Sequence, residues 1–431
     1  MRNVLWNIEG LERFTFTRYA VKALLIVVAA LTLSLPIFFR DKASLFYGFE
    51  AYYHITHGPL SRILSFFSYL LNIDVFLVAK ILPVVLGILT LLLFFEMLKK
   101  LEFRYWIVLL ASLILIFSPS FIFLYSTLTD FAFVAFLFVF GAYLFVCKKE
   151  IYALIVFYTV GFFGLFPLVV ASLLLLLYSL SIGKFRLFLY SIPSFAILLL
   201  SDARNLTSFG NFISDLGGPF GLGAFIVILS FFGLRSLWND KYTHFYFYLM
   251  LLVTIGLSFF NLRVLALLNF FLVLLAALGV ELLFERHWRS RLIKSLTIII
   301  LFVGLLLSAW SYMGSVIYGL PNGDVIDGLY ALRDLPYGTV FSHYSREYWI
   351  DFAGRPFFSD GSLLYTRDIG YATALMESNG VSYIWIDNDM KSKVWIEEDQ
   401  DLLFLLKYSK SFKEVYSNDY VTIWEFKKGG V

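Results

Sequence analysis

The chain has 431 residues, of which 60% are hydrophobic and only 15% are charged. Soluble globular domains average about 45–50% apolar and about 25% charged residues, so this composition excludes an ordinary soluble domain. The single cysteine, Cys147, excludes a disulfide framework within the chain. The net charge of +3 forms no patch typical of nucleic-acid binding. We therefore expect a polytopic α-helical protein with membrane lipid as a partner and no nucleic acid.

Long apolar runs recur over the first 320 residues, and most could cross a bilayer core of about 30 Å. The run at 151–182 contains Gly161, Gly164 and Pro167, and at about 1.5 Å per residue it is too long for one crossing. We read it as two short helices. The pattern predicts about eleven transmembrane helices, at 20–39, 75–98, 105–125, 128–147, 151–163, 167–182, 186–201, 220–237, 245–260, 264–284 and 293–313.

Lysine and arginine gather in alternate connecting segments, for example around Lys99, Lys148 and Arg286. Cytoplasmic loops carry the excess of these residues, which predicts a cytoplasmic N-terminus. Eleven crossings then place the loop at 40–74 and the C-terminal segment on the extracytoplasmic face. The charge balance agrees with two different surroundings, because residues 1–320 carry 23 Lys/Arg and 14 Asp/Glu, whereas 321–431 carry 11 and 17.

From Leu320 onward, Gly, Pro, Asp and Asn interrupt short alternating runs. These runs predict strands at 339–343, 381–386, 412–416 and 420–426, and helices at 368–378 and 397–406. About 110 residues suffice for one small α/β domain. We therefore expect a transmembrane domain at 1–319, with its external loop at 40–74, and an extracytoplasmic α/β domain at 320–431.

Two acids on the expected outer side differ from the others. Glu50 stands among aromatic residues in the first external loop, and Asp130 opens the fourth predicted helix after SPSFIFLYSTLTD. A pair of carboxylates can hold a divalent cation that neutralises a phosphate leaving group, or one can act as general base toward an acceptor. The alternative makes Glu50 a solvated loop residue and Asp130 a helix N-cap.

Histidine and arginine supply further candidates. If the loop is helical, Glu50, His54 and His57 fall on one face, a pattern that suits a metal or a phosphate. Histidines at a membrane interface can equally be packing residues. Arg263, at the outer mouth of a late helix, and Arg204 offer guanidinium groups for a lipid-linked phosphate, and the alternative is anchoring at the headgroup layer.

The sequence lacks a phosphate-cradling glycine-rich loop, a CxxC pair and an HExxH motif. Most predicted helices carry no charged residue deep inside. Ion-coupled pumps and channels need such groups near the midplane, so the acids at the outer face favour surface chemistry over transport.

The first loop, the second acid and the late arginine together resemble the GT-C superfamily of polyprenyl-phosphate-dependent glycosyltransferases, oligosaccharyltransferase catalytic subunits in particular. The stretch 49–54 (FEAYYH) is similar to the loop motif in which an acid precedes an aromatic pair. Thr129-Asp130 is similar to the family's second acid, and Arg263 to the arginine that meets the carrier phosphate.

The C-terminal segment extends this resemblance. Residues 348–356 (YWIDFAGRP), followed by Asp360, are similar to the segment after the Trp-Trp-Asp motif of oligosaccharyltransferases, and 381–387 is similar to a strand of such domains. The motif itself is replaced by His343-Tyr344-Ser345. In that family the motif reads the hydroxyl of the acceptor sequon, so the resemblance implies the donor and leaves the acceptor open among protein, lipid and polysaccharide.

The resemblance implies an enzyme that transfers a sugar or glycan from a polyprenyl-phosphate-linked donor. Glu50 and Asp130, with His54 as a further ligand, would hold Mg²⁺ or Mn²⁺ or activate the acceptor, while Arg263 and Arg204 would hold the carrier phosphate. One alternative is an oligosaccharyltransferase that acts on protein Asn. Others are a transporter or flippase of lipid-linked sugars, which would need a polar path through the helices, and a non-catalytic assembly subunit.

Overall fold

The computed structural model describes residues 15–40, 48, 50–164, 167, 170–173, 212–216, 221–238, 241–242, 244–395, 397 and 399–427, without the side chains of 15–18, 50 and 262. The predicted helix at 186–201 and most of that at 167–182 lie outside these residues. The chain forms two compact units, 1–38 with 80–316 and 39–79 with 317–431, called here the helical unit and the tail unit. These two units are defined by compactness alone and do not test the predicted domains at 1–319 and 320–431, which stay a prediction.

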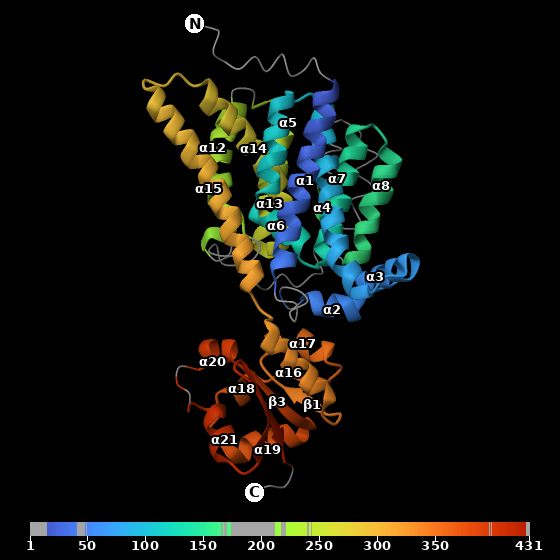
Figure 1. Cartoon of the computed structure of the whole chain (residues 1–431), viewed down its shortest axis with the longest axis vertical. Coiled ribbons are helices and arrows are strands. Elements are labelled where there is room, and N and C mark those ends of the chain that lie inside the picture. Colours follow the sequence, from blue (N-terminus) through green and yellow to red (C-terminus); the bar gives the residue numbers. More distant parts are fainter. Residues whose placement is uncertain are drawn as a thin grey trace. The chain divides into compact units, whose positions relative to one another are not determined.

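The helical unit is a bundle of long apolar helices (Figure 1). Among the described residues, four helical segments are long and apolar enough to cross a membrane: Tyr19–Phe39, Val75–Lys100, Leu265–Glu285 and Arg291–Asp334. The chain is thus a helical protein with several membrane-spanning segments and a small C-terminal sheet domain. The predicted count of about eleven crossings is not confirmed.

The helices of this unit follow most of the predicted runs closely. They are α1 (Thr15–Phe39), α4 (Val75–Lys100), α5 (Tyr105–Ile116), α6 (Pro119–Ser126), α7 (Asp130–Val146), α8 (Glu150–Thr159), α12 (Ala224–Leu237), α13 (Phe245–Phe260), α14 (Leu265–Glu285) and α15 (Arg291–Tyr318), with short 3-10 turns η2 (Val160–Phe163), η4 (Ser214–Leu216) and η6 (Leu262–Val264).

One predicted helix, 105–125, is broken into α5 and α6, which meet at a bend of 61°. Pro119 has no amide hydrogen and disfavours a helical conformation in the residue before it. The Ser118 side chain caps the new helix by accepting from the Phe121 amide, and Asn269 Nδ2 of α14 donates to Ser118 Oγ at 2.8 Å. The single-helix prediction was wrong because the apolar pattern continues across the break.

Helix α14 is the most deeply buried of the long helices, and it packs against α12 with backbones in close approach. A Cβ atom added at Gly233 would lie 1.8 Å from the Leu275 carbonyl oxygen, and one at Gly279 would lie 2.1 Å from that of Leu229. Small residues commonly permit such contact between membrane helices. The contact fixes α14, and with it the turn η6 from which the helix starts.

The tail unit contains a five-stranded sheet of order β2-β1-β3-β5-β4. Strand β1 runs parallel to β2 and β3, whereas β5 runs antiparallel to β3 and β4. The four predicted strands are confirmed, and only the two-residue β2 was not predicted. The strands are β1 (Thr339–Phe341), β2 (Phe357–Phe358), β3 (Val381–Asp387), β4 (Phe412–Ser417) and β5 (Val421–Phe426).

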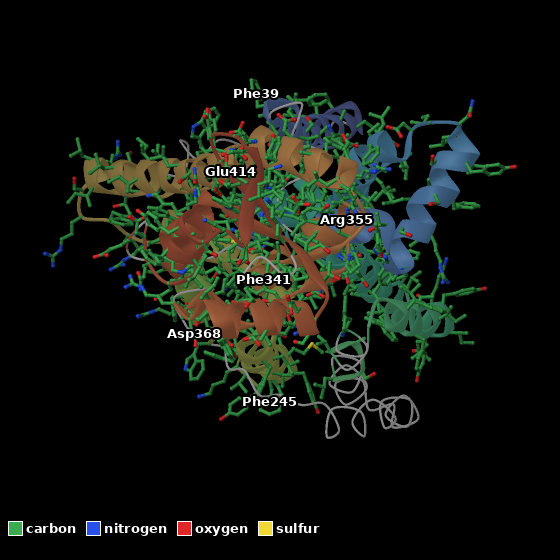
Figure 2. The ribbon with its side chains drawn as sticks, turned by 90° about the horizontal axis from the view of Figure 1, so that it is seen from below. Phe39, Phe245, Phe341, Arg355, Asp368 and Glu414 are labelled. Atoms are coloured by element: carbon green, nitrogen blue, oxygen red, sulfur yellow. The ribbon has the colours of Figure 1, made fainter. Side chains whose placement is uncertain are left out.

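Short helices surround this sheet. The predicted helix at 368–378 is confirmed as α19, which Asp368 caps by accepting from two backbone amides, whereas the helix predicted at 397–406 begins only at Leu402. Arg355 is buried and donates to the carbonyl oxygens of Leu332 and Pro336, so it holds the C-terminal end of α16 (Figure 2). The helices are α16 (Gly323–Asp334), α17 (Glu347–Phe352), α18 (Gly361–Leu364), α19 (Ile369–Ser378), α20 (Asn388–Val394) and α21 (Leu402–Tyr408).

The predicted external loop belongs to the tail unit and forms helices α2 (Glu50–Thr56) and α3 (Gly58–Leu71). Helix α2 packs on α17, with the buried Tyr52 ring 4.9 Å from that of Phe352. His57 Nδ1 lies 3.1 Å from an oxygen of Asp351. The aromatic residues that mark this loop in the sequence therefore form its contact with the C-terminal domain.

Candidate active site

Asp130 is the first residue of α7, but it is not the residue that caps the helix. Thr129 has the extended N-cap conformation, and its side chain accepts from the Ala132 amide at 3.3 Å. The alternative interpretation of Asp130 as an N-cap is therefore wrong. Its carboxylate is 16% exposed and lies beside a cation, Arg263. A carboxylate in the first turn also interacts favourably with the helix dipole.

Arg263 stands in the turn η6 between α13 and α14. The Asn261 side chain accepts from the Arg263 backbone amide at 3.0 Å and so fixes this turn. Arg263 Nη1 lies 3.6 Å from Asp130 Oδ1, and the Arg263 side chain is one-third exposed. The structure thus brings together two of the residues that the sequence singled out, 133 positions apart in the chain.

A half-buried guanidinium beside a carboxylate can bind a phosphate and hold a base near it. The planar fork of Arg matches phosphate oxygens, and such charge-assisted hydrogen bonds are stronger than neutral ones. The two charges attract one another more strongly than they would in water because the site is partly desolvated. The pair therefore forms a polar site at one end of an apolar bundle.

Glu50 opens α2, and its side chain is outside the described residues. It belongs to the tail unit and Asp130 to the helical unit, so their predicted pairing stays a prediction. The predicted single face with both histidines is wrong, because α2 ends at Thr56 and His57 is the extended residue before α3. His54 is buried, with its ring edge-on to Tyr53.

The predicted phosphate ligand Arg204 lies outside the described residues. Another acid of the helical unit, Asp215, has a structural contact at each oxygen: Oδ2 accepts from the Ala224 amide and Oδ1 from Ser308 Oγ, both at 2.6 Å. Asp215 thus holds the start of α12 against α15.

A buried charge cluster in the tail unit was not predicted from the sequence. Arg346 Nε and Nη2 donate to the two oxygens of Asp387 at 2.6 and 2.8 Å, and Nη2 also donates to Asp389 at 2.7 Å. Burial raises the pKa of the Asp389 carboxyl, but hydrogen bonds from Arg346 and Lys393 outweigh it, so the net pKa lies below the ordinary 3.8. Only the order of β1 and β3 in the sheet, which a sequence pattern does not show, brings these residues together.

The cluster lies directly after His343-Tyr344-Ser345, the replacement for the family motif. His343 Nδ1 lies 2.7 Å from Ser345 Oγ, and the Tyr344 ring is exposed and 4.1 Å from the imidazole. Burial and the nearby Arg346 lower the pKa of His343. The segment therefore presents a neutral, aromatic surface beside the carboxyl ends of the parallel strands.

No protein-family model matches the sequence, and no curated protein sequence matches it. Several solved structures do match this chain. The Archaeoglobus fulgidus oligosaccharyltransferase in its apo form aligns with 95% of this chain and 75% of its own, at 12% identity and a TM-score of 0.63. ArnT from Cupriavidus metallidurans, bound to undecaprenyl phosphate, aligns with 94% of this chain and 97% of its own, at 11% identity and a TM-score of 0.51. The chain has a GT-C fold.

Other structures agree with this GT-C fold. Arabinofuranosyltransferase AftD from Mycobacteria aligns with 96% of this chain at 11% identity and a TM-score of 0.55, although the match spans only 40% of AftD. The Archaeoglobus enzyme has also been solved with an acceptor peptide containing the NVT sequon, with Zn and sulfate, and with an inhibitory peptide and a dolichol-phosphate. The resemblance predicted from Glu50, Asp130 and Arg263 is confirmed at the level of the fold.

The described residues do not by themselves form a metal site. No group of three His, Cys, Asp or Glu side chains in that part of the chain could hold a metal ion. Asp130 there lies beside the guanidinium of Arg263, a cation. The described part of this GT-C fold thus presents an acid–arginine pair, and the predicted Mg²⁺ or Mn²⁺ stays a prediction.

Proposed function

We propose that the chain is a membrane glycosyltransferase that moves a sugar or glycan from a polyprenyl-phosphate-linked donor to an acceptor on the extracytoplasmic face. The observation that carries this proposal is the Asp130–Arg263 pair at one end of a bundle with a GT-C fold. The Lys and Arg distribution of the sequence supports the extracytoplasmic placement.

Arg263 is the proposed ligand of the donor phosphate, with Arg204 as a second candidate. The chemistry of the pair favours an anion next to the guanidinium, since a phosphate offers the same paired oxygens as the Asp130 carboxylate. Dolichol-phosphate and undecaprenyl phosphate occur in the solved structures of two proteins with this fold, which supports a lipid-linked phosphate as the ligand.

Asp130 is the proposed base in the transfer step. The acceptor oxygen or nitrogen attacks the anomeric carbon of the donor, and the bond between that carbon and the phosphate oxygen breaks. The phosphate leaves with the electron pair, and Arg263 stabilises its charge. The Asp130 carboxylate takes the proton that the acceptor loses. Glu50 is the second acid proposed for acceptor activation, on the similarity of its motif.

Metal dependence is a separate part of the proposal. The Archaeoglobus structure with Zn and sulfate supports a divalent cation in this fold, and the sequence favours Mg²⁺ or Mn²⁺ at Glu50 and Asp130, with His54 as a further ligand. The described residues alone do not fit a metal, and the roles of Asp130 and Arg263 in the transfer step require none. Transfer measured in EDTA and after re-addition of Mn²⁺ or Mg²⁺ tests the dependence.

The acceptor is proposed to be chosen by the tail domain. With His343-Tyr344-Ser345 in place of the sequon-reading motif, a sugar, lipid or polysaccharide acceptor is favoured over protein Asn. A direct comparison of an NVT-containing peptide with a glycan acceptor distinguishes the two, and efficient transfer to the peptide would overturn this part.

The main test measures transfer from a polyprenyl-phosphate sugar with the variants Asp130→Asn and Glu50→Gln. General acid–base catalysis contributes roughly 10²–10⁴-fold, so turnover of Asp130→Asn should fall by about that factor. Arg263→Ala should weaken donor binding by roughly 10–100-fold, as expected for a charge-assisted hydrogen bond.

Arg104→Ala is the matched control for the arginine. Arg104 also pairs with acids of the helical unit, Glu281 at 2.7 Å and Glu285 at 3.4 Å, but at the opposite end of α14 from Arg263. Its removal should leave transfer unchanged. Near wild-type turnover in both acid variants would sink the proposed function.

A further inference from the structure

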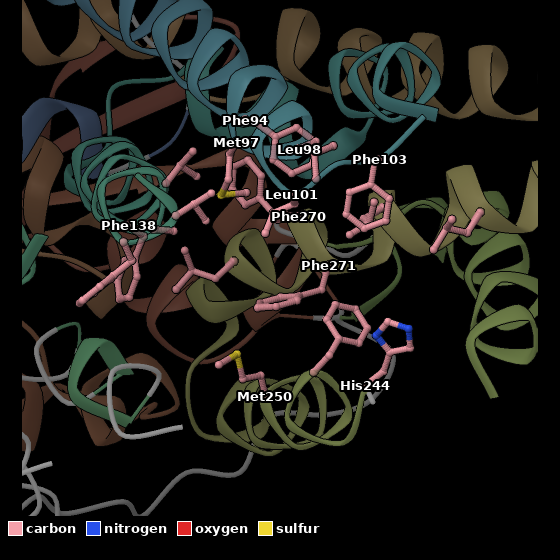
Figure 3. A pocket seen from close by; sticks show the side chains of 18 of the residues that line it. Phe94, Met97, Leu98, Leu101, Phe103, Phe138, His244, Met250, Phe270 and Phe271 are labelled. Atoms are coloured by element: carbon pink, nitrogen blue, oxygen red, sulfur yellow. The ribbon is translucent and has the colours of Figure 1, made fainter. Parts of the chain in front are cut away.

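The helical unit contains an apolar cavity of about 490 Å³. Figure 3 shows Phe94, Phe138, Phe270 and Phe271 around it, from helices α4, α7 and α14. Among the described lining residues, His244 at the start of α13 carries the sole titratable side chain. The volume lies within the range of about 300–1,000 Å³ for ligand pockets. With so few polar groups the cavity suits hydrocarbon better than water.

The cavity runs along the helices toward the end opposite the candidate active site. Leu101 follows the end of α4, Val146 ends α7 and Leu237 ends α12, and all three line the cavity. Along α14 the lining extends from Leu278 back to Leu267, which is four residues after Arg263 and about 6 Å from it along the helix axis. The proposed donor site therefore lies near one end of the cavity, and the turn before α13 lies near the other.

The turn between α12 and α13 puts a cation at this end. Lys241 Nζ lies 5.4 Å from the ring centroids of both Trp238 and Tyr242, and the two rings are 58% and 86% exposed. Exposed Trp and Tyr side chains beside a Lys are typical of a membrane interface. His244 connects this turn to the cavity, because it caps α13 and lines the cavity wall.

Lys241 differs from two cations at this end, Lys99 and Arg104. Lys99 pairs with Glu96 at 3.3 Å, and Arg104 pairs with Glu281, so an acid already compensates each of them. In the described part of the chain, the contacts of Lys241 are aromatic faces. An ammonium held on rings keeps its charge available to an anionic group in the headgroup layer.

We propose that the cavity holds an acyl chain of an anionic phospholipid, with the phosphate of its headgroup at Lys241 and His244. The apolar cavity would bind the acyl chain of the lipid, and Lys241 would bind the negatively charged phosphate. His244 lies between these two parts of the site. The headgroup position of this lipid, at Lys241 and His244, is distinct from Arg263, where the donor phosphate is proposed to bind. The protein would thus bind an anionic phospholipid from the leaflet at the Lys-rich end of the bundle.

Native mass spectrometry of the full chain, delipidated in detergent and titrated with phosphatidylglycerol or phosphatidylcholine, tests the proposal. One phosphatidylglycerol should be retained in preference to phosphatidylcholine. Ala142→Trp, which fills the cavity, should abolish this retention. Lys241→Gln lies outside the cavity and should weaken it about fivefold, the effect of one interfacial charge. Leu296→Trp, on the exposed face of α15, is the matched control and should retain the lipid as the wild type does.

Four results would overturn the proposal. The first is equal retention of the two phospholipids by the wild type, and the second is undiminished phosphatidylglycerol on Ala142→Trp. The third is displacement of phosphatidylglycerol by undecaprenyl phosphate at equal concentration, which would assign the cavity to a carrier lipid instead. Wild-type retention by Lys241→Gln would also remove the headgroup contact on which the choice of an anionic lipid rests.

Discussion

The buried charge cluster of the tail unit gives the sharpest stability prediction. The Arg346 side chain is 2% exposed and that of Asp387 is fully buried, and two hydrogen bonds join them. Arg346→Met would leave the Asp387 carboxylate buried without its cation. Breaking a buried ion pair on one side costs about 3–5 kcal/mol, so the tail domain should lose that much stability.

Hydrogen exchange measured on the full chain in detergent reports this loss locally. Peptides that cover β1 and β3 should exchange roughly 10²- to 10⁴-fold faster in Arg346→Met, because their protection reflects unfolding of the domain. The matched control is Arg367→Met. Arg367 is 60% exposed and 3.8 Å from Asp401, and a pair of this kind contributes about 0–1 kcal/mol.

A second substitution should restore part of the stability. Asp387 also accepts from the Met390 amide and the Trp385 indole, so a neutral residue at this position must keep an acceptor. Arg346→Met with Asp387→Asn removes the uncompensated buried charge and should recover part of the protection. Exchange in Arg346→Met within about fivefold of wild type would refute the argument, because it would mean that the pair contributes no more than a surface contact.

The remaining predictions concern pH and helix contacts. The folded pKa of Asp389 lies below 3.8, so its contribution to stability is present above pH 3.8 and is lost as the pH falls through the folded pKa. The stability of Asp389→Asn should therefore depend less on pH below 3.8, as measured by acid denaturation. Gly233→Ala should destabilise the bundle by about 1–3 kcal/mol in a denaturant titration, because its Cβ would meet the Leu275 oxygen, whereas Gly256→Ala, with open space around it, should not. Thr129→Ala should cost about 1 kcal/mol through the lost cap of α7, with turnover kept.

The sequence predicted those parts of the fold that depend on local pattern. Apolar runs located α13 at 245–260 and α14 within a residue at each end, because a membrane helix needs little more than length and hydrophobicity. The same pattern missed the break at Pro119, where neighbouring apolar residues hide a change of direction.

The sequence pattern could not predict contacts between segments that are distant along the chain. The packing of Tyr52 on Phe352 joins positions 300 residues apart, and no period or motif indicates it. No sequence pattern indicates that Arg346 is buried, because a charge is seldom buried without a partner and its partner Asp387 ends β3, 41 residues further along the chain. For the candidate site, the residue types of Asp130 and Arg263 could be chosen in advance, but their pairing required the fold.

The cap of α7 decides how cleanly Asp130 can be tested. Had Asp130 capped the helix, its substitution would have changed folding and chemistry together. Because Thr129 holds the N-cap, Asp130→Asn keeps the cap and loses mainly a charge in the first turn, worth about 0.3–1 kcal/mol. Such a cost is far too small to explain a roughly 10²–10⁴-fold loss of turnover. A large loss in Asp130→Asn with wild-type folding, set against retained turnover in Thr129→Ala, would therefore assign the carboxylate to the transfer reaction and not to the helix.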